Sequence, residues 1–502
     1  MSGIDQVIVD YTVEVYKRLH QIPEPHYETG KTRALIREEV EHHVLMCHTN
    51  GIRAKWSEYK GGIVVDLTPA AAEPERGILL LRADFDALVF KDRQGDPLNE
   101  ATGVLWASQH PGLMHACFHD AHTAMLLGFL KLLADTRGMD QLKRCLRLVW
   151  QDAEENPITE SGGAALVRTG VMEGVTEAYA LHLHPRHPVG TLLSYPGEML
   201  GNSGRLKTVF HGPTQAINPE SLVRVVVKAA GGHVARIDSE GVNALRVAQQ
   251  ILNVFYARGF VSHLLNLGGG SASNIMPQEA KLELSVYEGV KISDLRKLAN
   301  NVGGLYGANK VKTSLHKGSD NTRQTAPFAA VHLAMNLLAD LPVRKLGPWE
   351  PATLEPCVVE SGEPGEIECW WAIRNMLSPT ERDTYTEQVI KTIKAATDVH
   401  PGTTVDFTPF NGHPTLTNSP ESVAKIARLV QSAGMKWLES GRALGGEDFA
   451  HYLSTDGVEG AFIFNGCQKE GSGSFHTLTA QPHLDALKAG TTLLLSLAAA
   501  EN

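Results

Sequence analysis

The sequence predicts an α/β fold made of a layered domain that is interrupted by an inserted, enlarged α+β domain. Three observations lead to this prediction. Helices and strands alternate through the first 200 or so residues, which favours layers around a largely parallel sheet. The same pattern returns from about residue 413, and candidate site residues come from both ends of the chain. We therefore expect 1–204 and 413–502 to form one domain and 205–412 to be inserted into it.

The predicted elements of the outer parts follow from apolar periodicity. We expect helices at 4–20, 30–50, 122–134, 420–433 and 483–500, and strands at 61–69, 77–88, 145–155, 179–184 and 461–466.

The inserted part is expected to hold two units of one pattern, which runs strand, helix, strand, strand, helix, strand. The complete unit covers about 220–320, with strands at 223–230, 262–268, 281–288 and 310–318 and helices at 241–258 and 291–304. The other unit begins with a helix at 326–340 and lacks its first strand, which residues 205–210 could supply. We therefore predict a nested insertion; the alternative is one irregular domain with a decorated loop.

Composition excludes several classes of protein. The chain has 502 residues, 43% of them hydrophobic and 20% charged, as in an ordinary globular protein with room for two domains or more. A net charge of −10 argues against nucleic acid or an anionic membrane as the main partner. Six cysteines form no disulfide framework, and we find no signal peptide or membrane span, so a cytoplasmic protein is expected.

The segment HACFHDAH at 115–122 carries most of the chemistry. It places one thiol, one carboxylate and three imidazoles within a few residues, which are the ligand types that zinc and similar ions prefer. The alternative is a helix start with surface histidines. Two further groups of candidates end predicted strands, WQDAEE at 150–155 and LHLH at 181–184, and His476 stands near the C-terminus. Strand ends are where open α/β sheets collect functional side chains.

Together these segments resemble the zinc or manganese amidohydrolases of the aminoacylase and carboxypeptidase G superfamily. The chain is most similar to the branch of hippurate hydrolase, auxin-conjugate hydrolases and aminobenzoyl-glutamate hydrolase. The resemblance rests on the segments RLHQIPE (18–24), LRADFDAL (81–88), HACFHDAH, WQDAEE, GGH (231–233), NIMP (274–277) and GGEDF (445–449). It implies a catalytic domain of aminopeptidase-like type with an inserted lid domain.

The resemblance also implies the roles of individual residues. Two divalent metal ions, zinc or manganese, would be held by Cys117, His119, Glu155, His182 and His476. Glu154 would be the general base, which takes a proton from water and returns it to the leaving amine. Asp86 is given an orienting role, and the role of Asp84 stays open. His122, His184 and His187 are expected to support the ligands or lie on the surface.

In the inserted domain, His233 is expected to stabilise the oxyanion and Asn274 to hold the substrate carbonyl. Two positions depart from the family. Phe118 replaces a glycine and would narrow the pocket or stack on an aryl group. Tyr287 stands where relatives often carry an arginine for a substrate carboxylate, and Arg374 holds the equivalent place in the other unit. Anion recognition is therefore either retained through Arg374 or lost.

The resulting hypothesis is metal-dependent hydrolysis of a small amide bond in an N-acyl or N-aryl amino acid, an amino-acid conjugate or a dipeptide-like substrate. A catalytically silent metal-binding scaffold and an amide-forming transferase are the alternatives. The relatives resemble dimers in which one lid lends a histidine to the other subunit. A monomer is therefore possible if the second unit acts in cis, and a homodimer otherwise.

Overall fold

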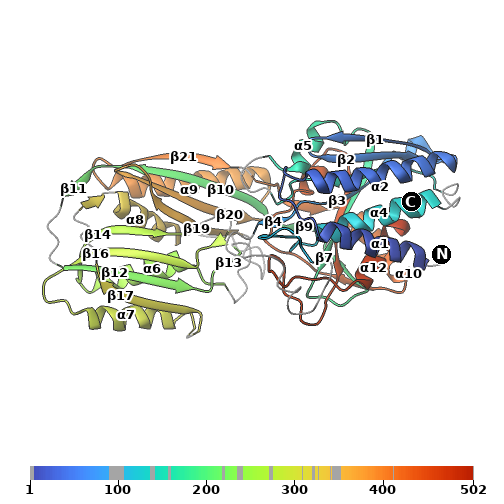
Figure 1. Cartoon of the computed structure of the whole chain (residues 1–502). Coiled ribbons are helices and arrows are strands. Elements are labelled where there is room, and N and C mark those ends of the chain that lie inside the picture. Colours follow the sequence, from blue (N-terminus) through green and yellow to red (C-terminus); the bar gives the residue numbers. More distant parts are fainter. Residues whose placement is uncertain are drawn as a thin grey trace. The chain divides into compact units, whose positions relative to one another are not determined.

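The computed structural model describes most of the chain, and Figure 1 labels its helices and strands. The described residues are 5–89, 107–135, 142–155, 160–216, 221–233, 241–270, 275–307, 309–318, 323–325, 327–339, 341, 352–410 and 412–500.

The chain divides into two compact units. The first unit comprises Met1–Met199, Leu416–Arg442 and Glu447–Asn502, and the second comprises Leu200–Thr415 and Ala443–Gly446. The assignment of a catalytic role to the first unit and of a lid role to the second stays a proposal. No helix among the described residues combines the length and the apolar character that crossing a membrane requires.

The first unit combines one eight-stranded sheet with helices and shorter strand pairs. Its elements are α1 (Gln6–His20), α2 (Gly30–Thr49), β1 (Arg53–Tyr59), β2 (Gly62–Thr68), η1 (Pro74–Arg76), β3 (Ile78–Asp84), β4 (Leu88–Val89), β5 (Leu113–Met114), α4 (His119–Asp135), β6 (Cys145–Gln151), α5 (Gly162–Arg168), β7 (Val175–His184), β8 (Thr191–Ser194), β9 (Gly197–Leu200), β22 (Leu416–Asn418), α10 (Pro420–Ser432), β23 (Lys436–Glu439), α11 (Ala450–Leu453), β24 (Glu459–Gly466) and α12 (Asp485–Ala499).

The strand order in this sheet is β1-β2-β6-β3-β7-β24-β8-β23. Strands β6, β3, β7 and β24 pair in parallel, whereas β1, β2 and β6 are joined in antiparallel fashion, as are β24 and β8. The sheet is therefore mixed, with a parallel centre. The parallel strands end at one edge, which brings the residues that follow β3, β6 and β7 together.

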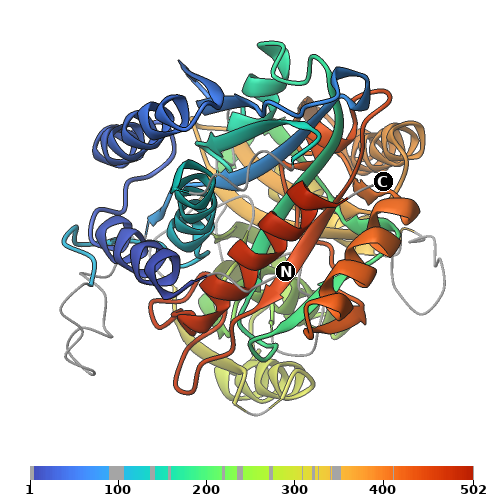
Figure 2. The ribbon, with the colours of Figure 1, turned by 90° about the vertical axis from the view of Figure 1, so that its right-hand side faces the viewer.

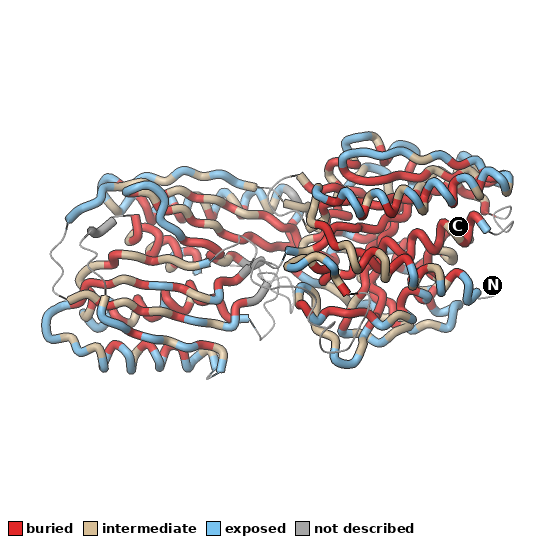
Figure 3. The backbone as a smooth tube through the Cα atoms, viewed as in Figure 1, coloured by how far each residue is buried: buried red, intermediate tan, exposed pale blue. Residues whose placement is uncertain are grey.

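The core of the first unit lies between this sheet and α1, α2, α4, α10 and α12 (Figure 2). Buried residues such as Leu81 in β3, Leu148 in β6 and Phe129 in α4 belong to one apolar cluster. In Figure 3 the central strands are buried along most of their length. That burial fits the predicted near-continuous apolar runs of β3 and β6.

The second unit holds a second eight-stranded sheet. Its elements are β10 (Asn202–His211), β11 (Thr214–Ala216), β12 (Ser221–Ala229), β13 (Gly232–His233), α6 (Ala244–Ala257), β14 (Val261–Gly269), β15 (Ile275–Met276), β16 (Glu279–Val286), α7 (Ile292–Gly304), β17 (Val311–Lys317), β18 (Arg323–Thr325), α8 (Pro327–Ala339), β19 (Ala352–Ser361), β20 (Glu366–Asn375), α9 (Pro379–Asp398) and β21 (Thr404–Phe410).

The strand order of the second sheet is β17-β12-β16-β14-β19-β20-β10-β21. One half, β17-β12-β16-β14, comes from Ser221–Lys317, and the other half, β21-β10-β20-β19, comes from the segments on either side. When the four strands of each half are numbered along the chain, both halves have the spatial order fourth, first, third, second. Strand β10 pairs with β20 along its whole length, so it occupies the place of the missing first strand. A nested insertion would produce this order, and we keep it as a proposal.

The predicted elements are confirmed in type, with shifted ends. Helix α4 begins at His119, three residues before its predicted start, so His119 and His122 lie one turn apart on the same helix. The predictions contain no strand at Arg53–Tyr59, where β1 extends the sheet. Its alternation of exposed and buried residues is too weak to distinguish a sheet edge from a loop.

We predict that Gly62→Ala destabilises the first unit strongly. Gly62 has φ of 156°, and an added Cβ would lie 2.2 Å from the Trp150 carbonyl oxygen. Backbone strain and overlap together should cost about 3 kcal/mol in the free energy of unfolding. Gly51→Ala is the control, because Gly51 has φ of 79° and nothing within 4 Å of an added Cβ. It should cost about 1 kcal/mol from strain alone. Equal denaturation midpoints for the two variants would contradict the close approach.

Candidate metal centre

The five predicted metal ligands lie together at the carboxyl edge of the first sheet. Two groups of three donors share Cys117: one with His119 and His182, and one with Glu155 and His476. Within each group the donor atoms lie within 4.8 Å of one another. Cys117 Sγ is 3.4 Å from His182 Nε2, and Glu155 Oε1 is 3.0 Å from His476 Nε2. The donors thus form two adjoining groups around one thiol.

The protonation of His182 suits a ligand. Its Nδ1 lies 2.8 Å from the carbonyl oxygen of Leu183, which can only accept, so Nδ1 donates and Nε2 keeps its lone pair. Burial, with the nearby His122, lowers the pKa of His182 well below its usual value. A neutral ring with Nε2 directed toward Cys117 is the arrangement that a metal requires of histidine.

Two further observations fit a cation in this place. Both ring nitrogens of His119 are buried without a hydrogen-bond partner, although carboxylates of Asp86 and Asp84 lie 3.4 and 3.7 Å away. Burial lowers the pKa of His119, but Asp84, Asp86 and Glu155 outweigh it and raise the pKa to about 10. Such a concentration of buried carboxylates attracts positive charge, and soft and imidazole donors beside it suit a zinc-like ion.

Glu154 and Glu155 are held by Asp86. The backbone N–H groups of Glu154 and Glu155 donate to the two carboxylate oxygens of Asp86, at 3.0 Å each. Asp86 therefore fixes the turn that presents both glutamates. Burial, with the charges of Glu447 and Glu155, raises the pKa of Glu154 well above its usual range. The pKa of Glu155 falls to about 2, because His476 and His119 outweigh its burial.

Asp84, whose role the sequence left open, belongs to a buried ionic network. Its carboxylate accepts from Arg82 Nη1 and from His122 Nδ1, at 2.7 Å each. His122 Nε2 accepts from the backbone N–H of Leu183 at 2.9 Å, so both its nitrogens are used. His122 therefore ties the end of β3 to β7 and has no free donor for a metal.

The network continues through Asp448, a residue of the GGEDF segment to which sequence reasoning gave no role. The Asp448 carboxylate accepts from Arg82 Nη2 at 2.6 Å, from Gln151 Nε2 at 2.7 Å and from the Gly163 backbone at 2.8 Å. Its neighbour Glu447 lies 3.2 Å from Arg82. The GGEDF motif was the available sequence signal for a role of Asp448. Its hydrogen-bond partners could not be identified from the motif, because they lie hundreds of residues away along the chain.

Phe118 is held in an unusual backbone conformation. Its φ is 68°, in the left-handed region, which explains the glycine that relatives carry there. Its ring is buried and packs edge-on against Phe475 at 5.9 Å between centroids. Phe475 also faces His182 at 5.4 Å and His184 at 5.3 Å. Phe118 thus belongs to a group of aromatic side chains beside the proposed metal ligands. Stacking of the Phe118 ring on a substrate stays a proposal.

The remaining predicted residues belong to the second unit. His233 ends β13, and its backbone pairs with Ile275 in β15, which places the GGH and NIMP segments side by side. Asn274 itself lies outside the described residues. Arg374 is buried near the end of β20, whereas Tyr287 follows β16 and is 47% exposed.

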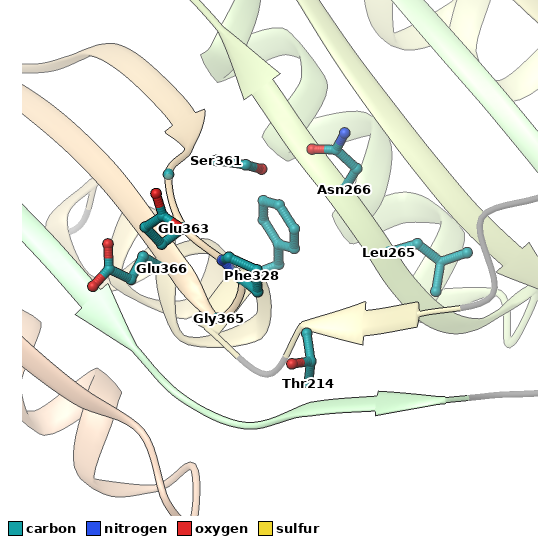
Figure 4. A pocket seen from close by; sticks show the side chains of 10 residues that line it. Thr214, Leu265, Asn266, Phe328, Ser361, Glu363, Gly365 and Glu366 are labelled. Atoms are coloured by element: carbon teal, nitrogen blue, oxygen red, sulfur yellow. The ribbon is translucent and has the colours of Figure 1, made fainter.

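A separate pocket of about 260 Å³ lies in the second unit (Figure 4). Phe328 and Leu265 line it together with Glu363 and Glu366. Its lining residues include no histidine or cysteine, so it lacks the imidazole and thiol donors of the candidate metal centre.

Comparisons with known proteins show the family to which the chain is related. The family model described as Peptidase family M20/M25/M40 matches residues 80–500. An N-acetyldiaminopimelate deacetylase of Exiguobacterium sibiricum is 30% identical over 225 residues, which are 44% of this chain and 54% of the relative. An N-acetyl-L-cysteine deacetylase of Bacillus subtilis is 32% identical over 277 residues, 55% of this chain and 58% of the relative. The matches thus span little more than half the length of these curated relatives.

A solved structure shares the fold. The crystal structure of a dinuclear metal-binding peptidase of the M20 family from Bacillus subtilis aligns with a TM-score of 0.57 and 18% identity. The alignment covers 99% of this chain and 98% of that one. The fold of this chain is therefore similar to that of a metal-binding peptidase.

We predict that Cys117→Ser loses metal. Cys117 is common to both donor groups, and a hydroxyl is a much weaker ligand than a thiolate. Elemental analysis of purified protein should show at least one ion fewer per chain than in the wild type. Cys145→Ser, a half-buried cysteine in β6 outside both donor groups, should keep the full content. Two ions retained by Cys117→Ser would remove the thiol from the ligand set.

Proposed function

Because the chain belongs to peptidase family M20/M25/M40, we propose that it is a metal-dependent hydrolase of a small amide bond. The substrate class is an N-acyl or N-aryl amino acid, an amino-acid conjugate or a dipeptide-like compound. The observation that carries the proposal is the convergence of five donors beside the high-pKa carboxyl group of Glu154. The deacetylase names of the relatives support an N-acyl amino acid as the first substrate to test.

Two divalent ions, zinc or manganese, would be held by the two donor groups. Cys117, His119 and His182 would serve one ion, and Glu155 and His476, with Cys117 shared, would serve the other. When bound, the ions would supply Lewis-acid chemistry that makes water acidic near neutral pH. The thiol ligand suits a reducing compartment, and the free cysteines of the described structure support the cytoplasm as the location.

Glu154 is the proposed proton carrier. It takes a proton from the attacking water and gives it to the leaving amine, so it must pass between charged and neutral forms during each cycle. Burial beside Glu447 and Asp448 favours the neutral, proton-holding form. Asp86 holds the Glu154 backbone through the N–H bond described above. A fixed backbone limits the positions that the carboxyl group can reach, which is what a proton carrier needs.

His233, Asn274 and Arg374 are proposed to act on the substrate from the second unit. His233 would stabilise the oxyanion, Asn274 would hold the carbonyl and Arg374 would contact a carboxylate. The repeated strand order of the second sheet supports a second lid unit in the same chain. If that unit takes the place of a partner's lid, His233 acts in cis and a monomer is active; otherwise a homodimer is required.

We predict that Glu154→Gln keeps its metal and loses activity. The amide preserves size but cannot carry a proton, so hydrolysis of an N-acetyl amino acid should fall by about 10²–10⁴-fold. Metal content by elemental analysis should stay equal to that of the wild type. Glu439→Gln, at an exposed position in β23, is the matched control and should retain both properties. Wild-type turnover by Glu154→Gln would exclude this carboxyl group as the base.

The cis arrangement predicts the outcome of a mixing experiment. Glu154→Gln and His233→Ala proteins, each inactive alone, should stay inactive when they are unfolded, mixed and refolded together. If His233 served a partner subunit, mixed dimers would contain one intact site and recover part of the activity. Recovered activity would therefore overturn the cis proposal, and size-exclusion chromatography would identify the species that carries it.

A further inference from the structure

Asp152 is a fully buried carboxylate directly after β6, two residues before Glu154, and the proposed reaction gives it no role. Its Oδ1 accepts from the backbone N–H of Tyr27 at 3.2 Å, and its Oδ2 accepts from the Thr29 hydroxyl at 2.5 Å. Arg33 of α2 donates to the same Oδ2 through Nη2 at 2.9 Å and through Nε at 3.2 Å. A cation and two further donors satisfy this buried charge, and they join the N-terminal segment to the end of β6.

Both the side chain and the main chain of Asp152 are tied to the hairpin between β1 and β2. The Arg33 guanidinium, which holds the carboxylate, also donates to the backbone carbonyl oxygens of Tyr59 and Lys60. The backbone N–H of Asp152 donates to the Gly61 carbonyl oxygen at 2.9 Å. Because these bonds share one hairpin, the Asp152 carboxylate and its backbone are held in a fixed relation to each other.

The residue between Asp152 and Glu154 has a strained backbone. Ala153 has φ of 56°, in the left-handed region that alanine seldom occupies. Tyr27, whose N–H donates to the Asp152 carboxylate, has φ of 59°. Two of the four non-glycine residues with positive φ in the described part of the chain therefore adjoin this one carboxylate. Such conformations persist only where the surroundings enforce them, and they gather at functional sites.

Restraints on both sides of Ala153 enforce its conformation. On the C-terminal side, the Asp86 carboxylate accepts from the backbone N–H of Glu154 at 3.0 Å. On the N-terminal side, Asp152 anchors the chain through the bonds described above. The Ala153 carbonyl accepts from the Gly162 N–H at 3.2 Å, and an added Cβ at Gly162 would overlap the Asp152 carbonyl oxygen. Rotation at Ala153 would redirect the Glu154 carboxyl group, so the anchor at Asp152 controls where that group points.

We propose that Asp152, paired with Arg33, is a positioning residue that keeps Ala153 left-handed and thereby aims the Glu154 carboxyl group at the attacking water. This role rests on the proposed hydrolase function, in which Glu154 carries the proton. Asp152 belongs to neither of the two donor groups around Cys117, so it acts on the base and not on the metal. Misplacement of a catalytic group by about 1 Å costs up to about 10²-fold in rate, so the anchor bears on turnover.

The test compares Asp152→Asn with the wild type on an N-acetyl amino acid, with both full-length proteins metal-loaded. Whichever way the new amide lies, its NH₂ group faces the Arg33 guanidinium or the Tyr27 N–H, so one donor opposes another. We expect kcat to fall about 10–100-fold, KM to stay within about twofold, and metal content to equal that of the wild type. Glu58→Gln is the matched control, because Glu58 is a second carboxylate 3.3 Å from Arg33 Nη1. It should keep kcat within about twofold of the wild type.

A double-mutant cycle with Ala153→Gly separates positioning from general destabilisation. Glycine adopts positive φ without strain, so in that background the anchor is less necessary. Asp152→Asn should then lower kcat by at most about threefold relative to Ala153→Gly alone. An equal loss in both backgrounds would overturn the proposal, because the effect of Asp152 would not pass through Ala153.

The remaining outcomes are also decisive. Wild-type kcat in Asp152→Asn would overturn the positioning role, and so would a loss of bound metal that accompanies the loss of activity. A wild-type protein that hydrolyses no N-acyl amino acid or dipeptide would instead refute the proposed function, and the positioning role with it. If Asp152→Asn does not fold, Thr29→Val decides, because it removes one donor to the carboxylate and keeps the ion pair with Arg33. Its kcat should fall about three- to tenfold, and an unchanged kcat would overturn the proposal.

Discussion

The carboxylates gathered at the ends of β3 and β6 impose the main electrostatic constraint on the first unit. Arg82 contacts three of them, Asp84, Glu447 and Asp448, within 3.2 Å. Among the described residues Glu154 has no ion-pair partner and Asp86 has only His119, 3.4 Å away, and burial raises the pKa of both carboxyl groups. Buried negative charge of this kind is tolerated when positive charge compensates it. Divalent ions beside these carboxylates would supply the missing charge and give the cluster its chemical use.

Backbone strain is concentrated in the same loops. Phe118, Ala153 and His476 have φ values of 68°, 56° and 58°, in a region that non-glycine residues seldom occupy. Phe118 lies beside Cys117, Ala153 lies beside Glu154, and His476 is itself a proposed metal ligand. Each conformation costs about 1–3 kcal/mol and persists only where the surroundings enforce it. The buried ring of Phe118 and the His476 N–H bond to the Ala116 carbonyl at 3.0 Å are such restraints. Ligand direction is thus fixed by the loops and not by the strands alone.

The sequence allowed the site residues to be proposed because metal ligation demands particular residue types within short motifs. Cys117, His119 and Glu155 are recognisable for that reason, and apolar periodicity located β3, β6 and α4. The bonds of Asp84 and Asp448 to Arg82 could not be anticipated in the same way. They depend on strand order and register, which bring residues 82 and 448 into contact. Local pattern contains no information on such pairings.

The two halves of the second sheet share one strand order but differ in which charged residues lie opposite each other. In the first half, Arg224 lies directly opposite Glu283, and the charge is neutralised by the fold itself. In the second half, Arg205 lies opposite Ala372, and the next polar position on β20 is Arg374. The second half also contains a paired cation, Lys207 with Glu368 at 2.7 Å, so the cations of its strands that lack a carboxylate partner among the described residues are Arg205 and Arg374. Because a neutral pair would be the less costly solution for folding, the unpaired arginines indicate a requirement that stability alone does not explain.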